Sequence, residues 1–390
     1  MTRPFRPLPA LPLALACAAL PALARAEETP RPLDLAASYV ADTVAVADGP
    51  ARGTRFVDLL RVDAAADLDQ AIGWHGARAV LTVEAGTGAQ PNALAGTVEG
   101  IDNAETSLNR PRLFQAYLEQ GLGALGAVKL GFVDLNCDFY ATEASGLLIA
   151  PPFGIGSELA ASGPNGPAIF PSTAPTVSLR LTPAPDVYLL AAALNAEARV
   201  IGDPGGPAPL LREGALLIGE AGWTAGGGKL ALGGWAYTRR QDDQRDTDAA
   251  GAPLRRRAWG AYALAERPLG PRLTAFVRGG ISDGDTTAFS GSFQAGLLLT
   301  QALPGRPASR LSAGFHAGFI APKYRANLAD AGDSQRPVEA GWEVTGEDQL
   351  APWLTIQPDL QFIRDTTRLP GSRDALVMTL RLTLTPPAQD

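Results

Sequence analysis

The chain has 390 residues, 46% of them hydrophobic and 19% charged, and this balance excludes a wholly disordered chain because it can bury a core. Its formal net charge of −7 argues against a nucleic-acid partner, since neutralising phosphates requires a basic surface. The 43 Gly and 33 Pro argue against an all-helical bundle, because both residues destabilise helix interiors.

The first 26 residues have the pattern of an export signal. Two early arginines precede an apolar stretch over residues 11–23, and Ala24-Arg25-Ala26 places small residues at both positions that a signal peptidase requires. Prolines within this stretch argue against the alternative, a buried N-terminal helix. We predict a signal peptide over residues 1–26 and a mature, exported domain over residues 27–390. No later segment has 18 uninterrupted apolar residues, which leaves secretion, the periplasm or an outer-membrane barrel.

Beyond residue 33 the dominant hydrophobic period is two. In residues 353–363, for example, Leu354, Ile356 and Leu360 alternate with polar residues, as expected of a strand with one apolar and one polar face. Sixteen such strands are predicted, at residues 35–47, 54–63, 77–86, 110–120, 125–135, 175–182, 186–196, 211–223, 228–239, 254–266, 271–283, 286–301, 307–321, 335–347, 351–363 and 372–385. The one good helical candidate is Ala64 to Ile72.

The connections between these strands differ systematically in length. Connections after even-numbered strands are mostly tight, at residues 121–124, 183–185, 224–227 and 268–270. Those after odd-numbered strands are mostly long and polar, at residues 85–109, 136–174, 197–210, 240–253 and 322–334. Short turns on one rim and long loops on the other are typical of an outer-membrane barrel, whereas a soluble sandwich has no reason to segregate them. The sequence therefore predicts an all-β fold, a transmembrane antiparallel barrel of about 16 strands.

The longest connection, residues 136–174, is too apolar for a free extracellular loop. It contains Leu147-Leu148-Ile149 and Pro151-Pro152-Phe153-Gly154. We expect it to fold inward and to constrict the pore. The alternative is a surface plug or a protein contact.

Two motifs match catalytic patterns without the context that those patterns need. Residues 121–126 match a dinucleotide fingerprint, but a strand rather than a helix follows, so a hairpin turn is predicted. Residues 280–284 match a nucleophile elbow, again followed by a strand. His75 and His316 have no neighbouring residues at metal-ligand spacing, and no clustered Ser-His-acid set can be assembled. We expect no enzyme activity, no metal and no cofactor.

Three segments carry a family resemblance. Gly100-Ile101-Asp102-Asn103, residues 112–120 and residues 130–139 resemble the carbohydrate-selective outer-membrane porin (OprB) family. Tyr39 and Val40, Gly53, Asp58 and Trp74-His75-Gly76 fit it too. The resemblance implies a sixteen-stranded barrel that passes small sugars, such as glucose, by passive facilitated diffusion.

The lumen-facing residues can be inferred from the strand at 110–120. Phe114, Ala116 and Leu118 share one face, and Gln115, Tyr117 and Glu119 share the other, which suits a polar lumen. A sugar needs hydroxyl partners and an apolar surface to slide along. The candidate pore residues are Glu119, Tyr117, Arg112, Trp74, Asn92 and Asp102. The alternative for Glu119 and Arg112 is an ion pair that braces the wall.

Three classes of function remain, with a sugar-preferring porin favoured over the others. The second is a general porin, or one with a different selectivity for small solutes or ions, and the third is an outer-membrane enzyme or adhesin. The expected partners are small sugars and outer-membrane lipid, with no nucleic acid. The oligomeric state is left open between a monomer and a homo-oligomer.

Overall fold

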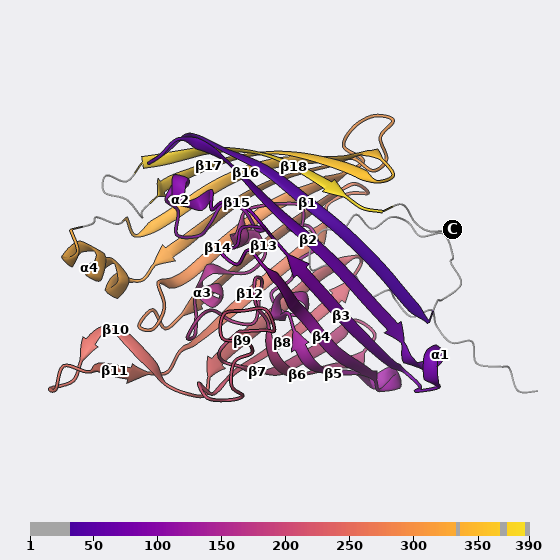
Figure 1. The fold of residues 1–390 in the computed structure, drawn as a ribbon, viewed down its shortest axis with the longest axis horizontal. Helices are drawn as coiled ribbons and strands as arrows, with labels where there is room; N and C mark the ends of the chain where they lie inside the picture. The colour runs from indigo at the N-terminus through magenta and orange to yellow at the C-terminus, as the bar shows by residue number, and fades with distance from the viewer. Residues whose placement is uncertain (1–31, 333–335, 367–372, 387–390) are drawn as a thin grey trace, which may run out of the picture.

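The computed structural model describes residues 32–332, 336–366 and 373–386, and within them sixteen antiparallel strands close into a barrel (Figure 1). The barrel strands are β1 (Leu33–Asp48), β2 (Gly53–Asp67), β3 (Ala77–Ala85), β4 (Pro111–Gly121), β5 (Gly126–Val133), β6 (Ala174–Ala184), β7 (Val187–Asn195), β8 (Ala215–Ala225), β9 (Gly228–Tyr237), β12 (Trp259–Pro268), β13 (Leu273–Ser282), β14 (Phe289–Thr300), β15 (Arg310–Ile320), β16 (Val338–Ala351), β17 (Leu354–Thr366) and β18 (Arg373–Leu384). β1 pairs with β18 and closes the barrel. The predicted fold class is therefore confirmed, while the predicted signal peptide lies outside the described residues.

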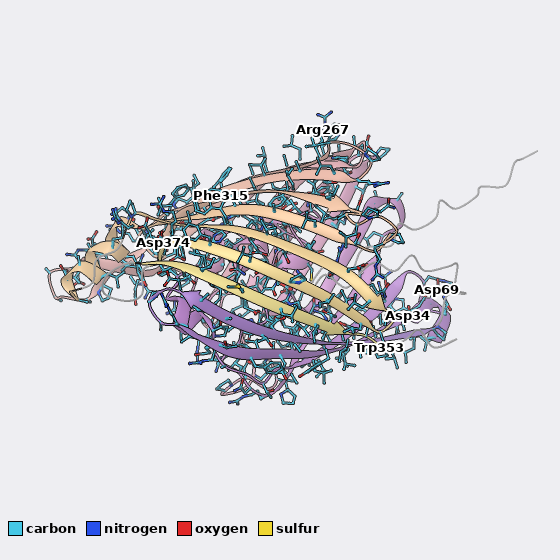
Figure 2. The ribbon with its side chains drawn as sticks, turned by 90° about the horizontal axis from the view of Figure 1, so that it is seen from above. Asp34, Asp69, Arg267, Phe315, Trp353 and Asp374 are labelled. Atoms are coloured by element: carbon cyan, nitrogen blue, oxygen red, sulfur yellow. The ribbon has the colours of Figure 1, made fainter. Side chains whose placement is uncertain are left out.

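The segregation of connection lengths is also observed. Short turns follow the even-numbered strands, including the 3-10 turn η1 (Gly123–Leu125) between β4 and β5, where a hairpin was predicted. Long connections gather at the other end, which is the extracellular end of such a barrel. Figure 1 shows α4 (Pro322–Asp330) with β10 (Gln241–Thr247) and β11 (Pro253–Arg256) at that end, and α1 (Leu68–Ile72) at the opposite, periplasmic end. In Figure 2, Asp69 and Trp353 lie toward the periplasmic end and Asp374 toward the extracellular one.

Three local predictions need correction. The predicted helix at 64–72 begins only at Leu68, because β2 continues to Asp67, whose carboxylate caps the helix by accepting from the N–H groups of Asp69 and Gln70. The loop predicted at 322–334 contains α4. The predicted strand at 254–266 covers parts of β11 and β12, and β10–β11 forms a hairpin apart from the barrel. Its charged sequence has no apolar period that could reveal it.

Lys323 on α4 joins three extracellular connections. Its Nζ lies 2.5 Å from Asp243, 2.8 Å from Asp246 and 2.7 Å from Asp285. Burial alone would raise the pKa of Asp243, but the hydrogen bond from Lys323 holds that pKa well below its usual range. The hairpin, α4 and the connection after β13 are thus tied together outside the membrane.

The outer wall carries the apolar residues of the period-two pattern. Phe293, Phe315, Trp342 and Phe362 form a row across β14–β17, with ring centroids 6.3, 5.1 and 6.0 Å apart (Phe315 is labelled in Figure 2). The row lies toward the extracellular ends of the strands, where an aromatic belt is expected at the lipid boundary. None of the helices in the described ranges is long and apolar enough to cross a membrane.

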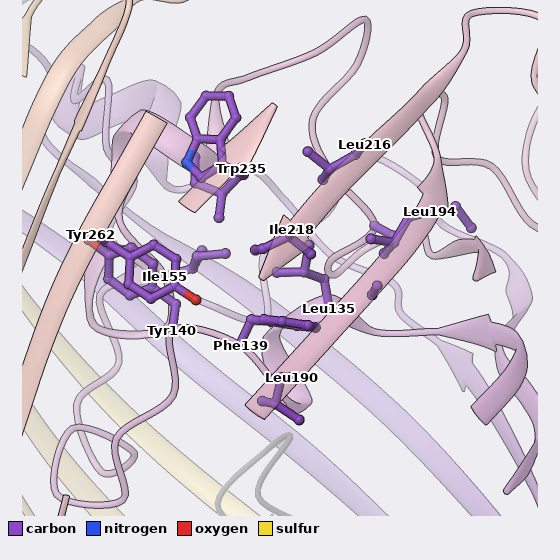
Figure 3. Packing of buried hydrophobic residues seen from close by; sticks show 14 of the residues in the cluster. Leu135, Phe139, Tyr140, Ile155, Leu190, Leu194, Leu216, Ile218, Trp235 and Tyr262 are labelled. Carbon is purple, nitrogen blue, oxygen red and sulfur yellow. The ribbon is translucent and has the colours of Figure 1, made fainter. Parts of the chain in front are cut away.

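The connection between β5 and β6 folds into the lumen, as predicted. It contains η2 (Leu135–Cys137), η3 (Pro151–Phe153) and α3 (Ser157–Ala160). Its Leu135, Tyr140 and Ile155 pack against Trp235 and Tyr262 on the inner wall (Figure 3). We call residues 134–173 the inner loop.

A second connection, residues 86–110, also folds inward, although only its Asn92 and Asp102 were expected at the pore. It contains α2 (Asn92–Ala95), and its Ile101 is fully buried against the wall near β17 and β18. Gln361 on β17 donates to the carbonyl of Ile101 at 2.9 Å, and Glu339 on β16 accepts from the N–H of Val98 at 3.0 Å. The inward position depends on these wall partners, which are remote in sequence.

A substitution at Gly233 would test how closely the inner wall is packed. It faces Tyr262 across β9 and β12, and an added Cβ would lie 2.1 Å from the Tyr262 ring. The ring cannot easily move, because its hydroxyl donates to Glu220 at 2.7 Å. We expect Gly233→Ala to lower the stability of the barrel by about 1–3 kcal/mol. Thermal unfolding of the detergent-solubilised protein measures this.

The matched control is Gly346→Ala on β16, where an added Cβ meets its nearest neighbour at 3.7 Å. Equal unfolding midpoints for the two variants would show that the inner wall tolerates extra volume and would contradict the close packing.

Candidate functional site

A cavity of about 690 Å³ lies inside the barrel and reaches the periplasmic turns. Its wall is made by the inner faces of β2–β6, the start of the inner loop and the turn between β8 and β9. Its charged residues are Arg61, Asp63, Arg78, Glu119, Lys129, Asp138, Glu143, Arg180, Asp186, Lys229 and Glu266. Both signs of charge are therefore interspersed around the space.

Strand alternation positions the β4 residues of this cavity. Gln115, Tyr117 and Glu119 all line it, on the face predicted from the sequence. Tyr117 lies opposite Gly131 on β5, where φ is 141° and a Cβ would come within 2.2 Å of the carbonyl oxygen of Ala116. Only glycine allows β5 this close approach beside the Tyr117 ring.

Lys129 on β5 connects the charged groups around Tyr117. Its Nζ lies 2.8 Å from Asp138 of the inner loop and 3.8 Å from Glu119. The ammonium also lies 5.5 Å from the centroid of the Tyr117 ring, a cation–π distance. The cavity thus presents a cation, two carboxylates and an aromatic ring side by side.

A second polar cluster lies further along the inner wall. Arg61 contacts Asp63 at 2.9 Å and Glu84 at 3.3 Å. Nearby, burial raises the pKa of Asp134, which begins the inner loop, to about 6.

Arg112 forms the far end of this cluster. Only 1% of its surface is exposed, one Nη donates to Thr106 at 3.2 Å, and the guanidinium lies 5.6 Å from the Phe170 ring centroid. Its Nε and other Nη have no hydrogen-bond partner in the described part of the chain, and nor does one oxygen each of Glu84 and Asp203. Buried donors and acceptors left open in this way are suited to water or solute hydroxyls.

The six candidate pore residues predicted from the sequence do not all lie at the same site. Tyr117 and Glu119 line the cavity, whereas Arg112 begins the same strand, seven residues from Glu119 and so roughly 23 Å away. The alternative ion pair of Glu119 with Arg112 is therefore wrong. The cation beside Glu119 is Lys129.

Asp102 and Asn92 support the second inward connection. Asp102 is buried and lies 3.5 Å from Arg381, which also contacts Asp42 at 2.7 Å. Burial and the Asp42 carboxylate raise the pKa of Asp102. Asn92 bonds within its own connection, where its side chain donates to the carbonyl of Thr97 at 3.2 Å.

Trp74 lies at the periplasmic rim and not among the cavity residues. It is 46% exposed, and its Nε1 donates to Gln120 at 2.8 Å. Gln120 alternates with Glu119 and so faces away from the lumen. This position suits the lipid boundary, where tryptophan is enriched.

Several cavity residues were missed, among them Lys129, Asp138, Arg180 and Lys229. Alternation along β5 could have placed Lys129 on an inner face, but nothing local links it to Asp138 beyond the end of that strand. The described residues contain no group of three or more His, Cys, Asp and Glu side chains that could hold a metal ion.

A Ser-His-acid set does assemble, contrary to the sequence expectation. Ser157 Oγ donates to Glu99, and His316 Nδ1 lies 2.8 Å from the other oxygen of Glu99. The carboxylate stands between the other two groups, so His316 is not placed to activate Ser157, and its side chain is only 2% exposed. The set joins the two inward connections to β15.

Wall carboxylates anchor the backbone of the inner loop. Glu343 on β16 accepts from the N–H groups of Ile149 at 2.5 Å and Ala150 at 2.9 Å. On β8, Glu220 accepts from the N–H of Tyr140 at 3.0 Å. Each bond satisfies a peptide group that has lost its contact with bulk water.

Glu343→Ala should loosen the inner loop. The change leaves two buried N–H groups without their partner, at a cost of about 1–3 kcal/mol each. We expect higher single-channel conductance and noisier open-channel current in planar bilayers. Glu347→Ala is the control on the same strand, because Glu347 pairs with Arg310 at 2.6 Å and not with the loop. Wild-type conductance in a folded Glu343→Ala variant would show that the loop stays in place without this anchor.

Comparisons with known proteins agree on one architecture. A family model described as "Carbohydrate-selective porin, OprB family" matches residues 51–385. The high-pH structure of Pseudomonas putida OprB superimposes with a TM-score of 0.79 at 21% identity, covering 90% of this chain and 94% of that chain. The outer membrane channel DcaP of Acinetobacter baumannii gives a TM-score of 0.57 at 11% identity, covering 90% and 96%. No curated protein matches the chain.

Proposed function

The chain belongs to the carbohydrate-selective porin family OprB and is an outer-membrane sugar porin, and from this premise we propose how its cavity handles the sugar. The proposed solutes are small neutral sugars, monosaccharides such as glucose, which diffuse passively along Tyr117, Glu119 and Lys129. The same path continues toward Arg112 and Glu84, whose buried polar atoms are partly without hydrogen-bond partners in the described part of the chain. No chemical conversion takes part.

The observation that carries the proposal is the pairing of charges beside Tyr117. Sugar hydroxyls both donate and accept hydrogen bonds, so they match a surface where Lys129 donates while Glu119 and Asp138 accept. Because opposite charges neutralise one another at short range, a solute ion gains little net attraction from the same groups. The arrangement therefore favours neutral polar solutes over ions of either sign.

Binding along this path must also be weak. A channel conducts only if its solute leaves as readily as it enters, and a wide aqueous cavity with dispersed partners meets this condition better than an enclosing pocket. Export depends on the predicted signal over residues 1–26.

Flux measurements in proteoliposomes test the proposal directly. We expect glucose to enter faster than gluconate, an anion of similar size, and faster than glucosamine, a cation of similar size. The alternative of another selectivity would appear as faster entry of one of the charged solutes. That alternative gains some support from Arg78 and Arg180, which have no ion-pair partner within the described ranges.

Glu119→Gln separates an electrostatic role from a steric one. The change keeps the size of the side chain and its hydrogen bonding but removes one negative charge from the cavity. We expect cation-to-anion permeability to shift toward anions, and the glucose concentration that half-blocks ion current to change by about fivefold at most.

Glu213→Gln at the extracellular rim is the control. If Glu119 serves only to hold Lys129 in place, the variant should lose thermal stability while permeability stays the same. That result would remove Glu119 from the proposed path.

A further inference from the structure

A shallow hollow of about 640 Å³ lies on the outer wall across β6–β9. Its floor comes from outward-facing Ala191, Gly219 and Gly234, which are neighbours in register across β7, β8 and β9. One row nearer the periplasm, Leu189 and Leu232 project, and one row nearer the outside, Val177 and Leu217 project. Small residues between two rows of larger ones create the depression.

The hollow lies in the extracellular half of the wall. Val177, Leu217 and Ala236, which line it, are each within three residues of the extracellular end of their strand. Beside Ala236 stands Trp259, 46% exposed on the outer face. This level corresponds to the outer leaflet just below its headgroups, where tryptophan is enriched.

Exposed arginines gather directly above the hollow. They lie beyond the extracellular ends of β8, β9 and β12 and are Arg212, Arg239, Arg240, Arg255 and Arg257. The carboxylates among them are Glu197, Glu213 and Asp242, which contact Arg212, Arg239 and Arg255. Arg240 and Arg257 have no carboxylate within 4.0 Å in the described part of the chain. Exposed pairs of this kind are weak, so these guanidiniums can turn toward another anion.

The connection before β8 adds apolar anchors at the same place. Leu210 is 70% exposed and Leu211 is 58% exposed, immediately before Arg212. A loop that presents two leucines and an arginine together is amphipathic, with apolar groups suited to acyl chains and a cation suited to headgroup phosphate. The loop therefore continues the hollow upward into the arginine cluster.

We propose that this surface binds a phosphorylated lipid of the outer leaflet. An acyl chain lies in the hollow against Ala191, Gly219 and Gly234, and the headgroup phosphate contacts Arg240 and Arg257. The assignment to a lipid follows from the stacking of the two features, since an apolar depression at membrane depth lies below unpaired cations at headgroup depth. Guanidinium groups bind phosphate with two parallel hydrogen bonds, and a phosphate with no ammonium group beside it keeps its full negative charge for them.

Binding of labelled lipid A to the detergent-solubilised full barrel tests the proposal. The contact with the headgroup phosphate is tested by the double variant Arg240→Gln with Arg257→Gln. Its control is Arg52→Gln on the far side of the barrel. The contact with the acyl chain is tested by the double variant Gly219→Leu with Gly234→Leu, whose new side chains fill the hollow. At both glycines an added Cβ meets its nearest neighbour at 3.6 Å, so the backbone tolerates the change. Its control is Gly346→Leu, where that distance is 3.7 Å.

We expect the arginine double variant to weaken lipid A binding by about tenfold and the leucine double variant to weaken it at least as much. Lipid A without its phosphates should bind both wild type and the arginine variant equally weakly. Both controls should match wild type, and heat-modified gel mobility confirms that every variant is folded. Lipid A affinity in the arginine variant within about twofold of the Arg52→Gln control would overturn the proposal. The proposal would also be overturned if inorganic phosphate alone bound the wild-type protein as tightly as lipid A, because the site would then recognise an anion and not a lipid.

Discussion

The structure depends on one constraint, that backbone folded inside a barrel must find hydrogen-bond partners in the wall. Strands satisfy their own peptide groups, but the inner loop and residues 86–110 do not. Here the wall supplies the partners: Glu343 and Glu220 accept from loop N–H groups, and Arg278 donates to the carbonyls of Tyr140 at 3.0 Å and Pro152 at 2.8 Å. An unpaired buried group costs about 1–3 kcal/mol, so these charges fix where the loops lie and hence the shape of the channel.

This use of charge divides the barrel into two parts. On β8 and β12–β16 the inward-facing charges are largely taken up by loop backbone, with aromatic rings filling the space between them. On β2–β5 several charges pair with one another at the cavity, as Lys129 does with Asp138 and Glu119. On β6–β9 the outward-facing residues include small ones, and these leave the hollow on the lipid side of the wall. The period-two alternation of the strands therefore supplies the side chains that hold the loop, those that line the solute path and those that contact lipid.

Whether a feature could be predicted from the sequence depends on how far apart along the chain its interacting residues lie. Alternation and connection length depend on residues within one segment, so all sixteen barrel strands and the lumen face of Tyr117 and Glu119 were predictable. The hairpin β10–β11 was not, because its order depends on Asp243 and on Lys323 some eighty residues away. The inward position of residues 86–110 depends on Glu339 and Gln361, more than 200 residues later. The error for Arg112 and Glu119 was avoidable, since the rise per residue of a strand separates them.

Hydrogen–deuterium exchange at the peptide N–H groups of Ile149 and Ala150 tests the central claim most directly, because both donate to Glu343. If wall carboxylates hold the inner loop, these amides should exchange as slowly as the strand amides of β16 and should become fast in Glu343→Ala. The exposed amides of Gly305 and Ala308, in the connection after β14, give the reference for unprotected backbone. Exchange at Ile149 and Ala150 as fast as this reference in the folded wild-type barrel would contradict the account.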